Sequence, residues 1–355
     1  MSNNDQTALK VFRTRNIILP VIISLGYIGY LMFKKWNQGS TEAINWGPQL
    51  YFWFSMTFML VGVRMISYMW RIRILSEKKL SWKASFQVIS IWEFASAITP
   101  SVIGGTAVAM FLLAKERIKL GKSTAIVLVT AFMDELFFIL FAPLLLFWVG
   151  KKKMFPDNSA FFSEDDTLSN VDSNYLIGMF VLGYIILLLY TLLIGYGLFF
   201  KPRAVKRLLG IIFTLPFLKK WRRNAVQTGM DIETASSELK TKKWKFWMAS
   251  FCATICAWIA RYLEANFVII AFIGFADQFV LFSRSFVMWI IMMIPLTPGA
   301  SGLAESSFIL LFKDISQNTE MFMVLFWRSF AYFPYLILGV IVLPRWIKRV
   351  YQIHA

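Results

Sequence analysis

Several residue types are scarce in this 355-residue sequence, and their scarcity excludes whole classes of protein. The single histidine, His354, is the second-last residue, which leaves neither a Ser-His-Asp triad nor a histidine metal site. The two cysteines, Cys252 and Cys256, lie four apart in one apolar stretch, where core packing is a better interpretation than a disulfide. Neither a GxGxxG motif nor a P-loop occurs. The sequence therefore predicts no cofactor and no metal.

Apolar residues dominate instead. They make up 58% of the chain, the mean hydropathy is +0.60, and long apolar runs indicate a polytopic membrane protein. The net charge of +17 is concentrated in the loops between these runs, as the positive-inside bias requires, so we do not interpret it as a nucleic-acid signal. Six full spans are predicted at residues 17–33, 50–70, 124–149, 175–200, 246–275 and 321–343.

Residues 86–114 are predicted to form a re-entrant hairpin, which enters the membrane and leaves on the same side. Thr99-Pro100 interrupts the helix, and Gly104-Gly105 permits a turn. The arms, 86–98 and 106–114, are too short to cross a bilayer core of about 30 Å. Basic residues on both flanks predict that both ends face the cytoplasm; they are Lys78, Lys79, Lys83, Lys115, Arg117, Lys119 and Lys122.

A second hairpin is predicted over residues 279–312, because the pattern Thr-Pro-x-x-x-Gly recurs there. Thr297, Pro298, Gly299 and Gly302 lie between short apolar arms at 279–294 and 303–312. Its flanks lack a basic cluster, which favours entry from the outer face; they carry Asp277, Lys313, Asp314 and Glu320. Two hairpins that enter from opposite faces would form an inverted repeat.

The predicted fold is thus an all-α polytopic membrane protein with about six full transmembrane helices plus two re-entrant hairpins in an inverted repeat. Residues 1–355 form a single membrane domain. Residues 50–149 are its first inverted unit and 246–343 its second, while 175–245 supply a connecting span and a basic cytoplasmic loop. We expect the loop 201–245 to lie on the anionic cytoplasmic leaflet.

Charged residues inside the apolar segments are the candidates for function. Each costs about 2.5–3.5 kcal/mol at mid-bilayer on insertion scales, so each should face a protein interior or a wet cavity. The first unit carries Glu93, Asp134 and Glu135; the second carries Arg261, Glu264, Arg284, Glu305 and Arg328. Arg64, near an inner helix end, is expected to snorkel. Arg261 and Glu264 are three apart and are expected to pair on one helix face.

These cations are predicted to bind a lipid head group. Arg261, Arg284 and Arg328 would hold its phosphate, as two converging guanidinium forks do. Glu93, Asp134, Glu264 and Glu305 would be their charge partners when the site is empty. The alternative is that the pairs only hold the bundle together, and the two roles are compatible.

Two further roles follow from the same segments. Half-helices that begin near Thr106 or Gly302 would offer backbone amides to an anion. Tight turns with close helix packing are the alternative for these tips. Glu93 and Asp134 could instead carry protons, since burial favours the neutral form of a carboxyl group.

Several motifs resemble the transmembrane region of the lysylphosphatidylglycerol synthase, or flippase-like, family. They are Thr99-Pro100 with Gly104-Gly105, Leu112-Leu113-Ala114-Lys115, Asp134, the stretch Pro298-Gly299-Ala300-Ser301-Gly302-Leu303-Ala304-Glu305, and Arg328. The sequence departs from the family pattern at Ala109-Met110 and at Thr130-Ala131. The resemblance implies movement of lipids across the bacterial inner membrane. The synthase domain of the best-known members is absent from this chain, so the resemblance implies no aminoacyl transfer.

The predicted function is therefore a flippase-like protein rather than an enzyme. It would translocate a phosphate-bearing or otherwise charged lipid across the bacterial inner membrane, with both termini in the cytoplasm. Two alternatives remain open: a membrane-embedded transferase acting on a lipid-linked substrate, and an accessory subunit of a lipid-modifying synthase. The expected partners are membrane lipids, with no nucleic acid; a homo-oligomer or a separate synthase partner is left open.

Overall fold

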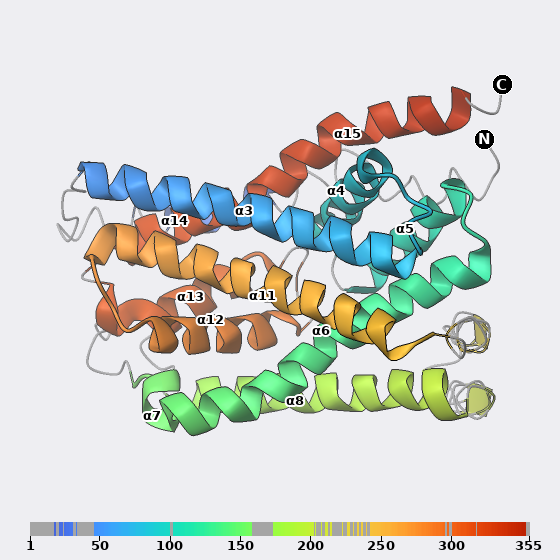
Figure 1. Ribbon diagram of the computed structural model, residues 1–355. Helices are drawn as coiled ribbons and strands as arrows, with labels where there is room; N and C mark the ends of the chain where they lie inside the picture. The colour runs from blue at the N-terminus through green and yellow to red at the C-terminus, as the bar shows by residue number, and fades with distance from the viewer. Residues whose placement is uncertain are drawn as a thin grey trace.

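The computed structural model describes residues 46–99, 102–157, 173–201, 242–294, 300–316 and 318–352, together with isolated positions between and before them. This part of the chain folds into helices joined by short turns, and it contains no strand (Figure 1). The all-α class predicted from the sequence is confirmed.

Five helical segments are long and apolar enough to cross a membrane. They are α3 (Pro48–Leu75), α6 (Leu120–Val149), α8 (Ser173–Gly195) with the π-helical turn η3 (Tyr196–Phe200), α11 (Trp244–Ile273), and α14 (Glu320–Ala331) followed by α15 (Phe333–Gln352). They agree with five of the six predicted spans. The sixth, at 17–33, lies mostly outside the described residues, so the count of six stays a prediction.

Large apolar side chains point outward from these helices. Phe58 on α3, Phe147 on α6, Leu189 on α8 and Ile337 on α15 are each at least 60% exposed. Large apolar side chains that are exposed along four long helices are expected where lipid replaces water. The outer surface therefore agrees with a membrane-embedded bundle.

Two pairs of short helices lie between the long ones. The first pair is α4 (Trp82–Ile98) and α5 (Val102–Lys115); the second is α12 (Gln278–Met292) and α13 (Leu303–Phe312). The longest, α4, has 17 residues and so spans about 25 Å, less than a bilayer core. Within each pair the helices pack on each other, and the two pairs occupy opposite ends of the long helices in Figure 1.

Local side-chain bonds explain where these short helices begin and end. The Ser81 hydroxyl accepts from the Ala84 amide at 3.1 Å, and the Asp277 carboxylate accepts from the Phe279 amide at 3.0 Å; both are N-caps. At the other end of α4, Thr99 takes an extended conformation ahead of Pro100. Pro100, Pro298 and Gly299 lie outside the described residues.

The core is divided into two main apolar clusters. One packs the second short pair against α6, α8 and α11, and the other packs the first short pair against α3, α6 and α15. Helices α3 and α11 run side by side along most of their length (Figure 1). They join the first half of the bundle, α3 to α6, to the second half, α11 to α15. Charged groups can gather between the two clusters, where these halves meet.

Ion pairs tie the helices together at the end where α3 finishes and α6 and α11 begin. Lys122 donates to Glu77 at 2.7 Å, and Lys242 donates to the same carboxylate. These two hydrogen bonds lower the pKa of Glu77 to about 2, so the carboxylate stays charged at every physiological pH. Glu116, just after α5, accepts from Trp346 at 2.8 Å and also from Arg349, which fixes the first pair to α15.

The structure extends the last predicted span. The last span was expected to end at residue 343, but α15 continues through Pro344 to Gln352 because Trp346 and Val350 are buried against its neighbours. Of the loop 201–245, only isolated positions and the start of α11 are described. Its placement on the cytoplasmic leaflet stays a prediction.

Gly339 lies where α15 crosses α4, and a methyl group on it would come within 2.0 Å of the buried Phe94 ring. We expect Gly339→Ala to destabilise the fold by about 1–3 kcal/mol, as overpacking usually does. The apparent melting temperature in detergent measures this change. Gly62→Ala on α3 is the matched control, because nothing lies within 4 Å of the added carbon. Equal melting temperatures for both variants would contradict a tight crossing.

Candidate functional site

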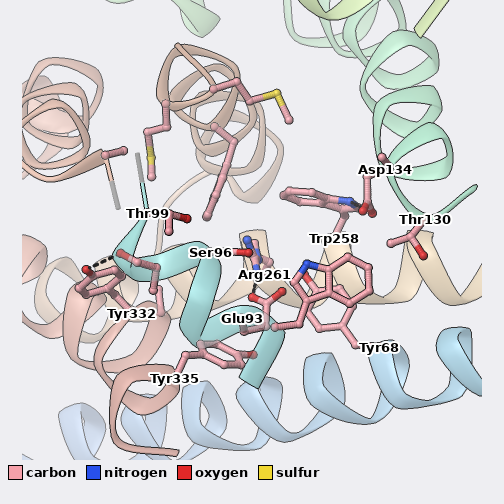
Figure 2. A pocket seen from close by; sticks show the side chains of 18 of the residues that line it. Tyr68, Glu93, Ser96, Thr99, Thr130, Asp134, Trp258, Arg261, Tyr332 and Tyr335 are labelled. Atoms are coloured by element: carbon pink, nitrogen blue, oxygen red, sulfur yellow. Dashed lines mark hydrogen bonds and ion pairs between the residues drawn. The ribbon is translucent and has the colours of Figure 1, made fainter. Parts of the chain in front are cut away.

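A cavity of about 300 Å³ lies where the two halves of the bundle meet. Its walls come from α3, α4, α6, α11, α12, α14 and α15 together with Thr106 of α5 (Figure 2). Both short pairs therefore contribute to the walls, and so does every long helix apart from α8. The turns between the short helices reach it through Thr99 on one side and Thr297 and Ala300 on the other. Residues from the turns of both short pairs therefore line one cavity.

Arg261 on α11 is a cavity cation that lies among three aromatic rings. Its guanidinium donates to Glu93 on α4 at 3.1 Å, and its carbon lies 4.6 Å from the Trp289 ring centre and 5.0 Å from that of Trp258. Tyr68 adds a third ring at 5.7 Å. The ion pair and the aromatic faces together compensate for the loss of water around a 9%-exposed arginine.

Arg71 on α3 provides a second pair. Its guanidinium donates to Asp134 on α6 and, at 3.1 Å, to the Thr254 hydroxyl. The same Asp134 oxygen accepts from the Trp258 indole at 2.9 Å. Trp258 therefore contacts both pairs, since it binds Asp134 through its nitrogen and faces Arg261 through its ring (Figure 2).

Arg328 on α14 provides the third pair, at the tip of the second short pair. Its Nε donates to Glu305 at 2.8 Å, while the other Glu305 oxygen accepts from the Gly302 amide at 2.6 Å. This bond is one half of a capping box, in which the side chain of the third helical residue accepts from the N-cap amide at the start of α13. Gly302 has φ +87°, a conformation that favours glycine. One carboxylate thus joins the cavity arginine to the helix terminus.

This geometry changes the expected role of the hairpin tips. The sequence suggested that Gly302 would offer an amide to an anion, but Glu305 already accepts from that amide. On the first pair, α5 begins at Val102, before Gly104 and Gly105. A Cβ at Gly105 would lie 2.1 Å from the Ser96 hydroxyl, so this glycine permits close packing of α5 on α4. Close helix packing, the alternative to anion binding at these tips, therefore accounts for Gly105.

Arg284 does not reach the cavity. Both of its terminal nitrogens donate to Asp314, at 2.6 and 2.9 Å, and it also donates to the carbonyls of Leu311 and Lys153. These bonds fasten α12 to the end of α13 and to α7 (Lys151–Met154). The expected convergence of Arg284 and Arg328 is therefore not found, and Arg284 has the structural role that was its alternative.

The expected pair between Arg261 and Glu264 is also not formed. Glu264 lies 2.8 Å from Arg64 of α3, with both side chains fully buried, and Arg64 also donates to the Tyr335 hydroxyl at 2.8 Å. The idea that Arg64 snorkels is wrong, because a partner carboxylate lies beside it on α11. Arg261 and Glu264 thus each pair with a residue of another helix and not with each other.

Arg71 is a functional residue that the sequence analysis does not single out, because it follows the predicted span 50–70 and precedes a run of basic residues. A signal was available. Arg64, Tyr68 and Arg71 follow one another at intervals of four and three, so they lie on one face of α3. That face meets α11 and the cavity.

Fold and site together define a class: a polytopic helical membrane protein in which two pairs of short helices border one charged cavity. The model of the lysylphosphatidylglycerol synthase TM region matches residues 17–339, and the chain belongs to that family. The resemblance noted from the sequence motifs is confirmed.

One curated relative is a UPF0104 membrane protein of Archaeoglobus fulgidus. It is 22% identical to this chain over 280 residues, which cover 74% of this chain and 76% of the relative. No solved structure matches the chain.

The Arg64–Glu264 pair can be tested as a structural element. Arg64→Met leaves a fully buried carboxylate without its cation and is expected to destabilise the protein by about 3–5 kcal/mol. Adding Glu264→Gln should restore most of the loss, because neutral groups then replace both charges. Thermal unfolding of the wild type and both variants in one detergent measures the effect. A double variant no more stable than Arg64→Met would contradict the pairing.

Proposed function

We propose that this protein moves a phosphate-bearing or otherwise charged lipid across the cytoplasmic membrane. The observation that carries the proposal is the set of three arginine–carboxylate pairs, Arg71–Asp134, Arg261–Glu93 and Arg328–Glu305, around one cavity between the two short helix pairs. A bundle that only had to be stable would not need three buried cations beside a cavity, because apolar side chains of similar size serve as well.

The placement of the short helices supports this proposal. Both pairs are too short to span a bilayer, and they lie at opposite ends of α3 and α11 (Figure 1). In a membrane this corresponds to two re-entrant hairpins, one from each face, as in transporters built from inverted repeats. The basic clusters around α4 and α5 would place that pair on the cytoplasmic side.

The ion pairs suggest how a head group could be accepted without leaving a charge bare. A phosphate that enters the cavity can take the place of Glu93 on Arg261 or of Asp134 on Arg71, as a second oxygen acceptor of similar geometry. Asp134 keeps a donor if it is released in this way, because it also accepts from the Trp258 indole. Exchange of partners costs less than exposing an unpaired ion in a dry interior.

Rocking of one half against the other would then change which side the cavity faces. The two cross-half contacts, Arg261–Glu93 and Arg64–Glu264, lie on α11 and its neighbours and would form the pivot. The acyl chains would stay in the lipid outside, against the exposed apolar faces. The charged cavity would handle only the head group.

The cavity cations provide the test. Arg261→Gln combined with Glu93→Gln removes the pair while keeping the charge balanced, and we expect it to slow lipid translocation about tenfold or more. One charge-assisted hydrogen bond contributes about 1.5–3 kcal/mol, and 1.4 kcal/mol is a factor of ten. The measurement is the rate at which a fluorescent anionic phospholipid changes leaflet in vesicles containing the purified protein.

The control is Arg203→Gln, which removes the charge of an arginine whose side chain is 90% exposed and far in sequence from the cavity residues. It should translocate lipid at the wild-type rate. Equal rates for the double variant and the control, with both proteins folded as judged by their melting temperatures, would refute the role given to this pair.

A further inference from the structure

Glu135 is one of three acids in the wall of the cavity, and it differs from the other two, Glu93 and Asp134. It follows Asp134 on α6 and is 8% exposed. Among the described residues it forms no ion pair, whereas each of Arg71, Arg261 and Arg328 is already bound to another carboxylate. Together with Glu305, the partner of Arg328, the described residues in and beside the cavity are therefore three arginines and four acids.

If Glu135 is ionised, its contact with Thr191 and the contact of Thr191 with Leu187 have only one hydrogen between them. The hydroxyl of Thr191 on α8 lies 2.8 Å from a Glu135 oxygen and also 2.8 Å from the Leu187 carbonyl. A hydroxyl has one hydrogen, and a carbonyl can only accept. If Thr191 donates to Leu187, the second contact needs a hydrogen on Glu135. If Glu135 is ionised, the hydroxyl must turn to donate to it instead.

The site thus satisfies both forms of the carboxyl group by rotation of one hydroxyl. Such a site can gain or lose a proton without repacking, which the other cavity acids cannot do. Asp134 is held by a guanidinium and an indole, and Glu93 by a guanidinium. The sequence had suggested Glu93 and Asp134 as proton carriers; the contacts favour their neighbour.

The groups that face Glu135 from the surrounding helices provide no competing cation. On α8 they are Thr191 and Tyr190. The cavity arginine of α3, Arg71, is bound by Asp134, and that of α11, Arg261, is bound by Glu93.

The other helices packed on α6 carry their charges away from the cavity. On α12, Arg284 is bound by Asp314. On α5 the charge described is Lys115, at the end of the helix, and on α7 the charges are exposed lysines. A change in the charge of Glu135 therefore acts mainly on the cavity itself.

We propose that Glu135 is a proton-binding site that couples lipid movement to a proton gradient. The proposal rests on the lipid translocation proposed above. With Glu135 protonated, the three pairs leave the cavity neutral, and an anionic head group can enter. With Glu135 ionised, the cavity carries an extra negative charge that repels the same head group. The proton and the anionic lipid would then enter together from one side and leave together on the other, the proton passing from water to Glu135 and back to water.

The coupling can be tested in vesicles that contain the full chain and a fluorescent phosphatidylglycerol. With one proton moved per lipid, a gradient of one pH unit should sustain up to about a tenfold difference in the amount of probe between the leaflets. We expect this asymmetry for the wild type and its loss for Glu135→Gln, which stays neutral at every pH but keeps nearly the same shape. Glu77→Gln, outside the cavity, should behave as the wild type.

Asymmetry that persists in Glu135→Gln, or a wild type that moves lipid without responding to the gradient, would overturn the coupling while the translocation itself stands. A wild type that moves no lipid under any condition would overturn the proposed function and the coupling with it.

The proton site itself can be tested without transport. Infrared titration of the purified protein should show the carbonyl band of a protonated carboxylic acid near neutral pH, and Glu135→Gln should remove it. Thr191→Val should move the titration to higher pH, because the charged form loses its hydroxyl donor. Thr57→Val, a buried threonine outside the cavity, should leave it unchanged. Spectra of the wild type and Glu135→Gln that coincide at all pH values would refute the site.

Discussion

The need to pair every buried cation with a carboxylate governs this structure. A guanidinium inside an apolar bundle is tolerated only with an acceptor close by, and four arginines around the cavity have one, as does Arg284 outside it. Two pairs lie within a half: Arg71–Asp134 in the first and Arg328–Glu305 in the second. The other two, Arg64–Glu264 and Arg261–Glu93, cross between the halves. The same interaction therefore fixes the shape of each half and the contact between them.

The broken helices make such a cavity possible. Because α4 and α13 end or begin inside the bundle, their termini bring turns and polar groups to a depth at which a continuous helix would present only side chains. The aromatic residues around Arg261 then determine how dry that cavity is. Trp258 and Trp289 cover the guanidinium faces and leave its edges for oxygen acceptors, which suits a ligand that binds in the plane of the guanidinium.

Charge balance links the proposed transport to its proposed energy source. Three arginines matched by three carboxylates make a neutral cavity, and a fourth carboxyl group that can hold a proton allows the charge of the cavity to change by one. A cavity that accepts an anion in one state and repels it in the other needs a group of this kind. Glu135 suits that role because its one described polar contact, a hydroxyl, can both donate and accept.

The sequence by itself determined the class of protein and the positions of the helices. The lengths of the apolar runs and the Thr-Pro breaks are local properties, so five spans and both short pairs could be predicted from them. Six of the seven charged residues that line or support the cavity could be predicted as well: Glu93, Asp134, Glu135, Arg261, Glu305 and Arg328. Only the tertiary structure decided which charges meet. Arg261 and Glu264 are neighbours along one helix, yet each finds its partner on another, because helices packed side by side offer acceptors as near as those one turn away. For the same reason Arg71 belongs to the cavity although it resembles a loop cation, and Arg284 does not, although it lies within an apolar segment.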